Sequence, residues 1–179
     1  MTGLDFPADV LVRAKRIRLI GFDIDGVMTD GGLYFSGDGE LCKRFQVQDG
    51  FGLKLLMQAG IEVVVITGRD SAIVTRRARD LGIAEVHQNV PDKRACLDAL
   101  LAKRQLQWPE AAYLGDDWPD LGVLRRVGLS AAPANADRIV SQHVHWQTPR
   151  AGGQGAVRDV CDLLLIAQGH YQRLLESHL

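Results

Sequence analysis

Two carboxylates stand one residue apart at the end of a mostly apolar segment. The segment IRLIGF covers residues 17–22, and Asp23 and Asp25 follow it directly. A short, β-branched segment bounded by turn residues is typical of a buried strand, and side chains two residues apart on a strand point to the same face. Two like charges held so close repel each other, and a hard cation with oxygen ligands relieves the repulsion. The pattern indicates a metal or phosphate site, or, as the ordinary alternative, a solvated turn.

A hydroxyl and an ammonium group stand at two other element ends. Thr67 ends the apolar segment IEVVVIT, and Gly68 after it lets backbone N–H groups approach an anion closely. Lys93 falls in the first turn of a predicted helix, where a cation opposes the helix dipole and therefore fits better beside an anion. The ordinary alternatives are that Thr67 caps the next helix and that Lys93 is a solvated neighbour of Asp92.

A second acidic cluster follows the apolar segment AAYL. It contains Asp116 and Asp117, with Asp120 one turn further on. Asp116 and Asp117 could instead be N-caps of a helix that begins near Pro119. Taken together, two acidic clusters, a hydroxyl and an ammonium are the groups that phosphoryl transfer requires, because its catalysis consists mainly of positioning and of charge neutralisation.

The elements that must position these groups alternate along the chain. Strands are predicted at 61–67, 84–88, 111–114, 129–132 and 143–147, and helices at 51–59, 71–81, 92–105, 121–127, 136–141 and from 154 to about 177. This alternation predicts an α/β fold with a Rossmann-like, doubly wound, mostly parallel sheet, whose ligand site lies at the carboxyl ends of the strands. Residues 32–48 predict a β-hairpin inserted after the first strand, with its turn at Gly37, Asp38 and Gly39. Residues 1–15 are left open between a helix and a loose arm.

Length and composition restrict the class of protein. The 179 residues suit a single domain, and the hydrophobic share of 46% and charged share of 24% are those of an ordinary globular chain. A net charge of −1 argues against a nucleic-acid partner, and the sequence holds no apolar run of membrane-spanning length. The three cysteines form no C-x-x-C pair, which predicts a reducing, cytoplasmic location.

The order Asp-x-Asp-Gly, Thr-Gly-Arg, Lys, Gly-Asp-Asp resembles the haloacid dehalogenase superfamily of phosphatases, and this resemblance implies a role for each residue. Asp23 is expected to be the nucleophile, Asp25 the acid and base, and Thr67 and Lys93 the groups that hold the phosphoryl group. The implied cofactor is Mg²⁺, bound by the Asp23 carboxylate, the Asp25 main-chain carbonyl and Asp116. Asp117 and Asp120 are expected to lie next to these ligands and to hold them in position without binding the metal themselves. The chain has no room for a cap domain.

Longer segments are similar to the 3-deoxy-D-manno-octulosonate 8-phosphate phosphatase family from about Arg16 to Gly169. They are DIDGVMTDGGLYF, KRFQVQDGFGLKLL, VVVITGRDS, GDDWPDLGVLRRVGLSAAPANA and GGQGAVRDVCDLLLIAQG. The resemblance implies a capless homotetramer, with active sites at the subunit interfaces, that releases phosphate from an eight-carbon acid sugar of bacterial lipopolysaccharide. It assigns Thr67, Gly68, Arg69 and Lys93 to substrate binding.

Three expectations attached to this resemblance remain open at the level of sequence. Residues from about 150 to 179 are expected to form a C-terminal lid or helix, in which Gln154 stands where family members often carry arginine. The substrate could instead be a nine-carbon acid-sugar phosphate, since very similar relatives act on such compounds. The chain could also be a non-catalytic tetramerisation module, although the presence of both Asp23 and Asp25 argues against this.

Overall fold

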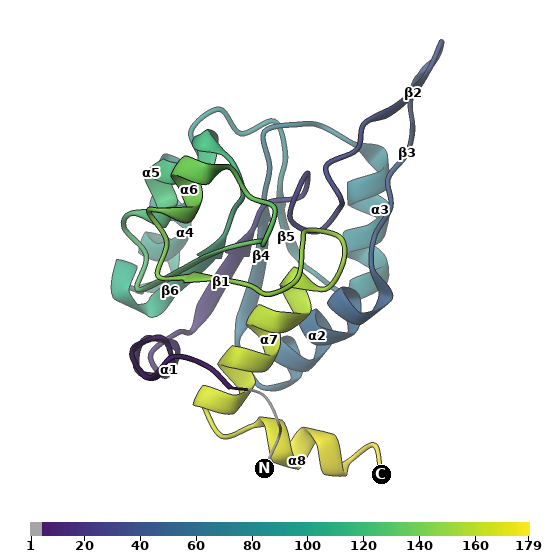
Figure 1. The fold of residues 1–179 in the computed structure, drawn as a ribbon. Coiled ribbons are helices and arrows are strands. Elements are labelled where there is room, and N and C mark those ends of the chain that lie inside the picture. The colour runs from purple at the N-terminus through teal and green to yellow at the C-terminus, as the bar shows by residue number, and fades with distance from the viewer. Residues whose placement is uncertain (1–4) are drawn as a thin grey trace.

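The computed structural model describes residues 5–179, and a six-stranded parallel sheet forms its centre (Figure 1). The strand order is β5-β4-β1-β6-β7-β8, and every neighbouring pair is parallel. The strands are β1 (Leu19–Phe22), β4 (Glu62–Ile66), β5 (Glu85–His87), β6 (Ala111–Leu114), β7 (Leu129–Ala132) and β8 (Trp146–Gln147). The predicted doubly wound α/β fold is confirmed.

Helices cover both faces of this sheet and divide the core in two. One face is packed against α1 (Ala8–Ala14), α2 (Val47–Gln58), α3 (Ala72–Leu81), α7 (Ala156–Ala167) and α8 (Tyr171–Glu176). The other face is packed against α4 (Lys93–Arg104), α5 (Leu121–Leu124) and α6 (Arg138–Ser141). Ile20 belongs to the first core and Leu19 to the second, because successive strand residues point to opposite faces. Within residues 5–179, every helix is too short or too polar to cross a bilayer.

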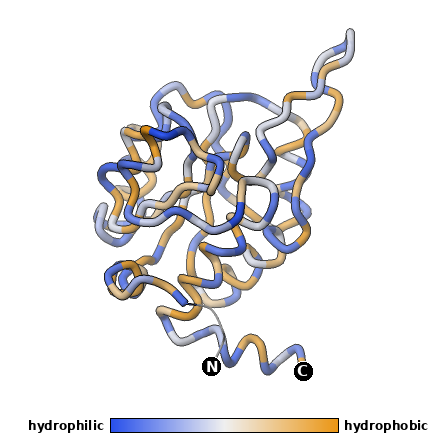
Figure 2. Tube along the Cα trace, in the orientation of Figure 1, coloured by the Kyte–Doolittle hydropathy of each residue, from blue (hydrophilic) through white to orange (hydrophobic). Residues whose placement is uncertain are grey.

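Hydropathy along the chain follows this layering (Figure 2). Hydrophobic stretches run along the sheet and along α2 and α7, which pack closely against each other. α1 lies within the N-terminal segment that the sequence left undecided, while Met1 to Leu4 fall outside the described residues.

The predicted hairpin is present but shorter than expected. β2 (Tyr34–Ser36) and β3 (Gly39–Cys42) pair antiparallel and project away from the body of the protein (Figure 1). Phe45 then makes only an isolated bridge to Thr29, and Val47 already begins α2. The extension of the hairpin to residue 48 is therefore wrong, as is the start of the helix at residue 51. The misleading signal was alternation of apolar residues through Val47, whose side chain is exposed and belongs to a helix.

The single long helix predicted from residue 154 to about 177 is also wrong. α7 ends at Ala167, Gly169 takes a left-handed conformation with φ of 76°, and α8 starts at Tyr171. A helix cannot continue through a left-handed residue, which glycine adopts at little cost. The C-terminal segment is thus two helices joined by a turn.

Candidate active site

The strand register brings three of the predicted site residues to one edge of the sheet. Phe22 at the end of β1 pairs with Val65 of β4 and with Leu114 of β6. Asp23, Thr67 and Asp116 come shortly after these paired residues, at the carboxyl ends of adjacent strands. The Asp23 backbone N–H donates to the Leu114 carbonyl at 3.1 Å, so the parallel pairing extends as far as Asp23 itself.

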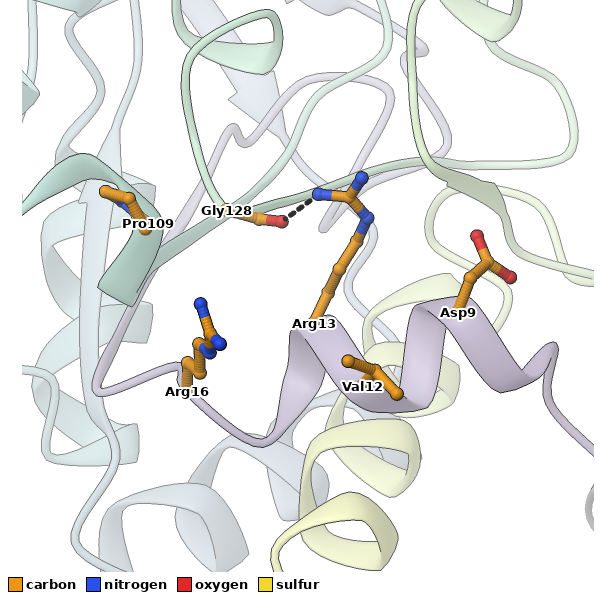
Figure 3. Close-up of a pocket in the computed structure, with 6 residues that line it drawn as sticks. All are labelled: Asp9, Val12, Arg13, Arg16, Pro109 and Gly128. Atoms are coloured by element: carbon orange, nitrogen blue, oxygen red, sulfur yellow. Dashed lines mark hydrogen bonds between the residues drawn. The ribbon is translucent and has the colours of Figure 1, made fainter.

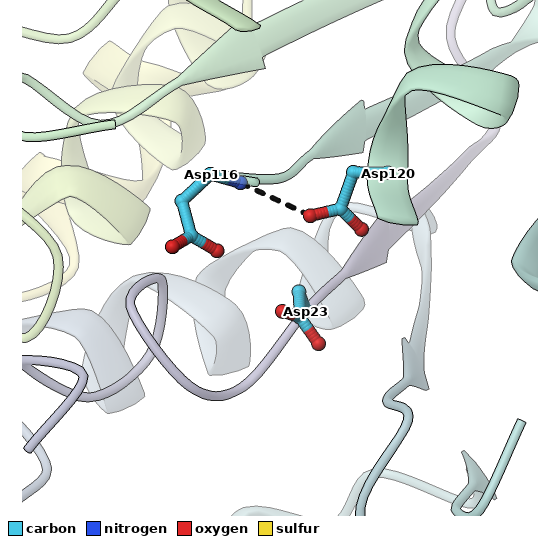
Figure 4. A group of neighbouring side chains, drawn as sticks. All are labelled: Asp23, Asp116 and Asp120. Carbon is cyan, nitrogen blue, oxygen red and sulfur yellow. Dashed lines mark hydrogen bonds between the residues drawn. The ribbon is translucent and has the colours of Figure 1, made fainter. Parts of the chain in front are cut away.

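Three carboxylates converge at this edge (Figure 4). One oxygen of each of Asp23, Asp116 and Asp120 lies within 4.8 Å of the others. Asp116 comes this close only because residue 26 is glycine, since a Cβ there would lie 2.1 Å from the Asp116 Oδ2 atom. Gly26 also has φ of 89°, a conformation that disfavours other residues. The Asp-x-Asp-Gly motif therefore requires its glycine for both space and backbone conformation.

Crowding and burial disfavour the charged form of two of these acids. Burial, reinforced by Asp120 and opposed by Lys93, raises the pKa of Asp23 to about 6. Burial together with the charges of Asp23 and Asp120 raises the pKa of Asp116 to about 8. A divalent cation between them would reverse this effect by favouring both ionised carboxylates.

Lys93 is the cation that the protein itself supplies. Its side chain is 5% exposed, and its Nζ lies 2.9 Å from Asp23 Oδ1 and 2.7 Å from Asp120 Oδ1. Burial lowers the pKa of Lys93, but the two carboxylates raise it more, so the net shift is upward and the ammonium stays charged. Asp92 caps α4 by accepting from the Ala95 N–H at 3.0 Å, whereas Lys93 pairs with Asp23 and Asp120. The alternative of a solvated surface lysine is wrong.

The oxygens of the three carboxylates differ in what they are free to bind. Asp120 uses both, because Oδ1 accepts from Lys93 and Oδ2 accepts from the backbone N–H of Asp116 at 3.1 Å. Asp116 Oδ1 is buried without a hydrogen-bond partner among residues 5–179, and Asp23 Oδ1 is buried with only the ion pair to Lys93 beside it. Buried, unsatisfied carboxylate oxygens on Asp23 and Asp116 are a donor set that fits a hard divalent cation such as Mg²⁺.

The other predicted residues occupy distinct positions around this cluster. Thr67 is buried at the end of β4 and does not cap α3, because Ser71 does so through the Val74 N–H. Gly68 and Arg69 are exposed just beyond it, and Arg69 Nε lies 3.6 Å from Asp25 Oδ2.

The last acidic motif splits into two kinds of residue. Asp117 is exposed and caps a short helix, η2 (Trp118–Asp120), by accepting from the Trp118 N–H at 2.8 Å. Asp116 makes no such cap and turns toward Asp23 instead. Within this motif, helix capping therefore applies to Asp117, whereas Asp116 lies in the cluster of carboxylates.

Lys43, which follows directly after β3, lies beside the site although no sequence motif indicated it. Its Nζ lies 2.5 Å from Asp25 Oδ1 and 3.0 Å from Glu40 Oε1, and its side chain is 1% exposed. Burial lowers the pKa of Lys43, but the hydrogen bonds to Asp25 and Glu40 raise it more, so the net shift is upward. A lone lysine after a hairpin strand carries no distinctive signal, which explains the omission.

The glycines at positions 152 and 153, near the start of the expected C-terminal lid or helix, pack against their own chain. The Gly153 N–H donates to the Val27 carbonyl at 3.0 Å, and the Gly152 N–H donates to Asn135 Oδ1 at 2.9 Å. A Cβ on Gly152 would lie 1.8 Å from the Gly26 carbonyl oxygen, so only glycine fits there. The following α7 is a helix whose residues are mostly buried in the core, whereas Gln154 is exposed.

A separate pocket lies at the opposite edge of the sheet (Figure 3). It is lined by Asp9, Val12, Arg13, Arg16, Pro109 and Gly128, at the amino ends of β6 and β7 and beside α1. Arg13 Nη1 there donates to the Gly128 carbonyl at 3.1 Å. This pocket holds none of the predicted site residues, so the acidic edge remains the candidate active site.

Comparison with known proteins agrees with this geometry. No protein-family model matches the chain. The chain is 45% identical over 160 residues to the 3-deoxy-D-manno-octulosonate 8-phosphate phosphatase of Yersinia pestis, which covers 89% of this chain and 86% of that protein. The chain belongs to the 3-deoxy-D-manno-octulosonate 8-phosphate phosphatase family. The counterpart from Escherichia coli K12 is 43% identical over 162 residues, covering 90% and 86% of the two chains.

Solved structures of this phosphatase family share the whole architecture. The enzyme from Moraxella catarrhalis, solved with a magnesium ion, a phosphate ion and a 3-deoxy-D-manno-octulosonate molecule, has a TM-score of 0.94 at 37% identity, covering 97% of this chain and 100% of that one. A structure from Pseudomonas syringae, named as a probable YrbI family phosphatase, has a TM-score of 0.95 at 48% identity, covering 96% and 98% of the two chains. A related Legionella pneumophila structure is described as a hydrolase of the haloacid dehalogenase superfamily. The resemblance noted in the sequence is confirmed.

Proposed function

We propose that this protein is a magnesium-dependent phosphomonoesterase that hydrolyses 3-deoxy-D-manno-octulosonate 8-phosphate to the free sugar acid and phosphate. In bacteria this reaction serves the synthesis of lipopolysaccharide precursors, as the family resemblance implies. The observation that carries the proposal is the buried arrangement of Asp23, Lys93 and Asp116 in a chain of this family. It combines a nucleophile, a fixed cation and free carboxylate oxygens at one point.

In the first step, a carboxylate oxygen of Asp23 attacks the phosphorus atom and forms an aspartyl-phosphate while the bond to the sugar oxygen breaks. The ammonium group of Lys93, whose Nζ lies 2.9 Å from Asp23 Oδ1, stabilises the negative charge of the phosphoryl group. The Thr67 hydroxyl and the Gly68 backbone N–H lie at the adjacent strand end, where they would bind phosphoryl oxygens. When bound by Asp23, the Asp25 carbonyl and Asp116, Mg²⁺ supplies positive charge that the phosphoryl group shares.

Asp25 handles the protons of both steps. Its carboxyl group gives a proton to the departing sugar oxygen, and the resulting carboxylate then takes one from the water that hydrolyses the aspartyl-phosphate. Phosphate leaves and both aspartates return to their initial state. The Asp25 side chain faces Lys43 and Arg69, which places it on the side of the site where the sugar would lie. Arg69 is 46% exposed on its side chain and is available to a sugar acid there.

The proposed substrate rests on the family and on its Moraxella member, which was solved with 3-deoxy-D-manno-octulosonate. A nine-carbon acid-sugar phosphate is the second candidate, because it offers the same phosphoryl group and a closely similar sugar acid. A purely structural tetramerisation module is the third, and the intact pairing of Asp23 with Lys93 argues against it.

We propose further that the active protein is a cytoplasmic homotetramer in which each active site is completed by a neighbour. The hairpin supports this proposal because it exposes large apolar side chains, with Leu33 at 48%, Phe35 at 57% and Leu41 at 64%. An isolated two-stranded hairpin is only marginally stable in water, and exposed apolar patches mark interaction surfaces. The free cysteines Cys42, Cys96 and Cys161 fit a reducing compartment.

The test is phosphate release from eight-carbon and nine-carbon acid-sugar phosphates and from hexose phosphates, each with Mg²⁺ and with a chelator. We expect magnesium-dependent release with a strong preference for the eight-carbon substrate. Preference for a nine-carbon acid-sugar phosphate would change the assigned substrate and leave the proposed reaction unchanged. No release from any phosphate, by a folded protein saturated with Mg²⁺, would contradict catalysis and favour the structural role.

A further inference from the structure

The base of the hairpin holds a buried lysine to which the proposed chemistry gives no role. Lys43 follows β3, and its side chain is 1% exposed although the hairpin itself projects into solvent. A buried ammonium group is costly unless it is paired and hydrogen-bonded. Its partners are therefore the reason for its position, and the nearest of them is Asp25, at 2.5 Å.

Lys43 is one member of a connected set of polar groups. Glu40 of β3 accepts from Lys43 at 3.0 Å through Oε1, and its Oε2 accepts from the Ser71 hydroxyl. Ser71 is the N-cap of α3, so its position is fixed by the helix. The hydrogen bonds thus run from a helix end, through the hairpin, to the carboxylate of Asp25.

An ordinary surface ion pair in the same hairpin region offers a comparison. Arg44 lies 3.6 Å from Asp30, with 57% of its side chain exposed, and such pairs contribute little. Lys43 is the adjacent residue, yet it is buried, has two carboxylate partners and is directed at the acid–base residue. A role limited to holding the hairpin would not require Asp25 as the partner.

We propose that Lys43 is a positioning residue, which through its contact with Asp25 holds that carboxyl group in the orientation needed to protonate the departing sugar oxygen. This inference rests on the proposed function. Asp25 donates the proton as the bond between phosphorus and the sugar oxygen breaks, and Lys43 keeps all of its own protons. Small displacements of a catalytic group lower rates strongly, so a side chain that fixes Asp25 affects the reaction without touching the substrate.

The test compares two leaving groups, because a proton donor matters most when the leaving oxygen is strongly basic. A sugar alkoxide needs protonation, whereas p-nitrophenolate leaves without it. We expect Lys43→Met to lower kcat/KM for 3-deoxy-D-manno-octulosonate 8-phosphate roughly ten- to a hundredfold, and for p-nitrophenyl phosphate less than about threefold. Asp25→Asn should show the same dependence on leaving group, and Lys43→Met added to it should cause no further loss.

Two further variants separate positioning from folding. Lys43→Arg keeps the charge and should restore part of the activity toward the sugar phosphate. Lys103→Met removes an exposed lysine of α4 and should change neither substrate's turnover. Circular dichroism and sedimentation would verify that each variant is folded and assembled like the wild type.

Each other outcome contradicts the proposal in a recognisable way. Equal losses for the two substrates would show that Lys43 supports the fold rather than Asp25. A rise in KM for the sugar phosphate at unchanged kcat would show that Lys43 binds substrate. Wild-type protein that hydrolyses neither compound would overturn the proposed function together with this inference, whereas an active wild type with equally active variants would overturn the inference alone.

Discussion

At the scale of single residues, the site depends on keeping Asp23 ionised in a buried place. Burial raises its pKa to about 6, and Lys93 at 2.9 Å is the group that opposes this rise. The proposed nucleophile and its cation therefore form one unit, and we expect neither residue to function without the other.

We expect Asp23→Asn to reduce phosphate release at least about a thousandfold, because the amide cannot form the aspartyl-phosphate. The two side chains have nearly the same shape, so circular dichroism and the thermal transition should stay close to those of the wild type. Turnover within tenfold of wild type would contradict the assignment of the nucleophile.

We predict that Asp116 lowers the stability of the metal-free protein as the pH rises, although we expect the same residue to be needed for activity. Its pKa rises from 3.8 in the unfolded chain to about 8 in the metal-free fold, because of burial and of Asp23. The folded state then binds more protons at Asp116 between these values, so the contribution of Asp116 to stability is greatest below pH 3.8 and falls as the pH rises toward 8.

In chelator at pH 8, Asp116→Asn should therefore be more stable than the wild type by roughly 1–3 kcal/mol, since it removes a buried, unpaired charge. Added Mg²⁺ should raise the melting temperature of the wild type and leave that of the variant unchanged. Calorimetry across pH 4–8 measures both effects. A variant less stable than the wild type in chelator would show that Asp116 is already neutralised by the protein.

The proximity of most of the proposed site residues could be predicted from the sequence for one physical reason. Asp23, Thr67 and Asp116 each follow an apolar strand, and parallel strands bring their carboxyl ends together. Lys43 could not be found in this way, because its burial depends on how the hairpin base packs on Asp25. Similarly, only the structure divides Asp116, which faces Asp23, from Asp117, which caps a helix.

At the scale of elements, the close packing of two loops holds the active-site turn in place. Gly152 and Gly153 lie against Gly26 and Thr29, with so little space that any side chain on residue 152 would overlap the Gly26 carbonyl. The turn that follows Asp25 is thereby held between the sheet and the start of α7.

We expect Gly152→Ala to destabilise the fold by about 1–3 kcal/mol, as for overpacking of a filled core, and to lower kcat as the turn moves. Gly37→Ala is the matched control, because a Cβ at the tip of the hairpin meets no atom within 4 Å. Chemical denaturation and phosphate release would be measured on both variants. Equal stability of the two would contradict the close approach of these loops.

Element boundaries were predicted least well, and local backbone geometry explains why. The hydrophobic pattern continues smoothly through residues 154–177, and only the left-handed conformation of Gly169 divides α7 from α8. The start of α2 was placed late because the exposed Val47 extends the alternation of a strand. The order of strands and helices did follow from the sequence, since each core-forming segment is long enough to bury a complete face.

At the scale of the whole molecule, the projecting hairpin is the surface with the clearest need of a partner. We expect Leu41→Glu, which places a charge on a residue 64% exposed in the single chain, to shift the sedimentation profile from tetramer to smaller species. Phosphate release should fall with it if neighbouring subunits complete the site. The exposed Arg76→Glu on α3 is a comparison for charge alone. A fully active monomer would contradict the shared site.

The contact between Gly153 and Val27 joins positions that are far apart in the chain, so the turn after Asp25 packs against a segment that is synthesised much later. A ribosome has already released Asp23, Thr67, Lys93 and Asp116 when residue 153 is still to be made. Long-range contacts of this kind form late in folding. The emerging polypeptide therefore holds every reactive group, and the turn after Asp25, before it holds the segment that packs on that turn, and we expect catalytic activity only once residue 153 has been made and has folded.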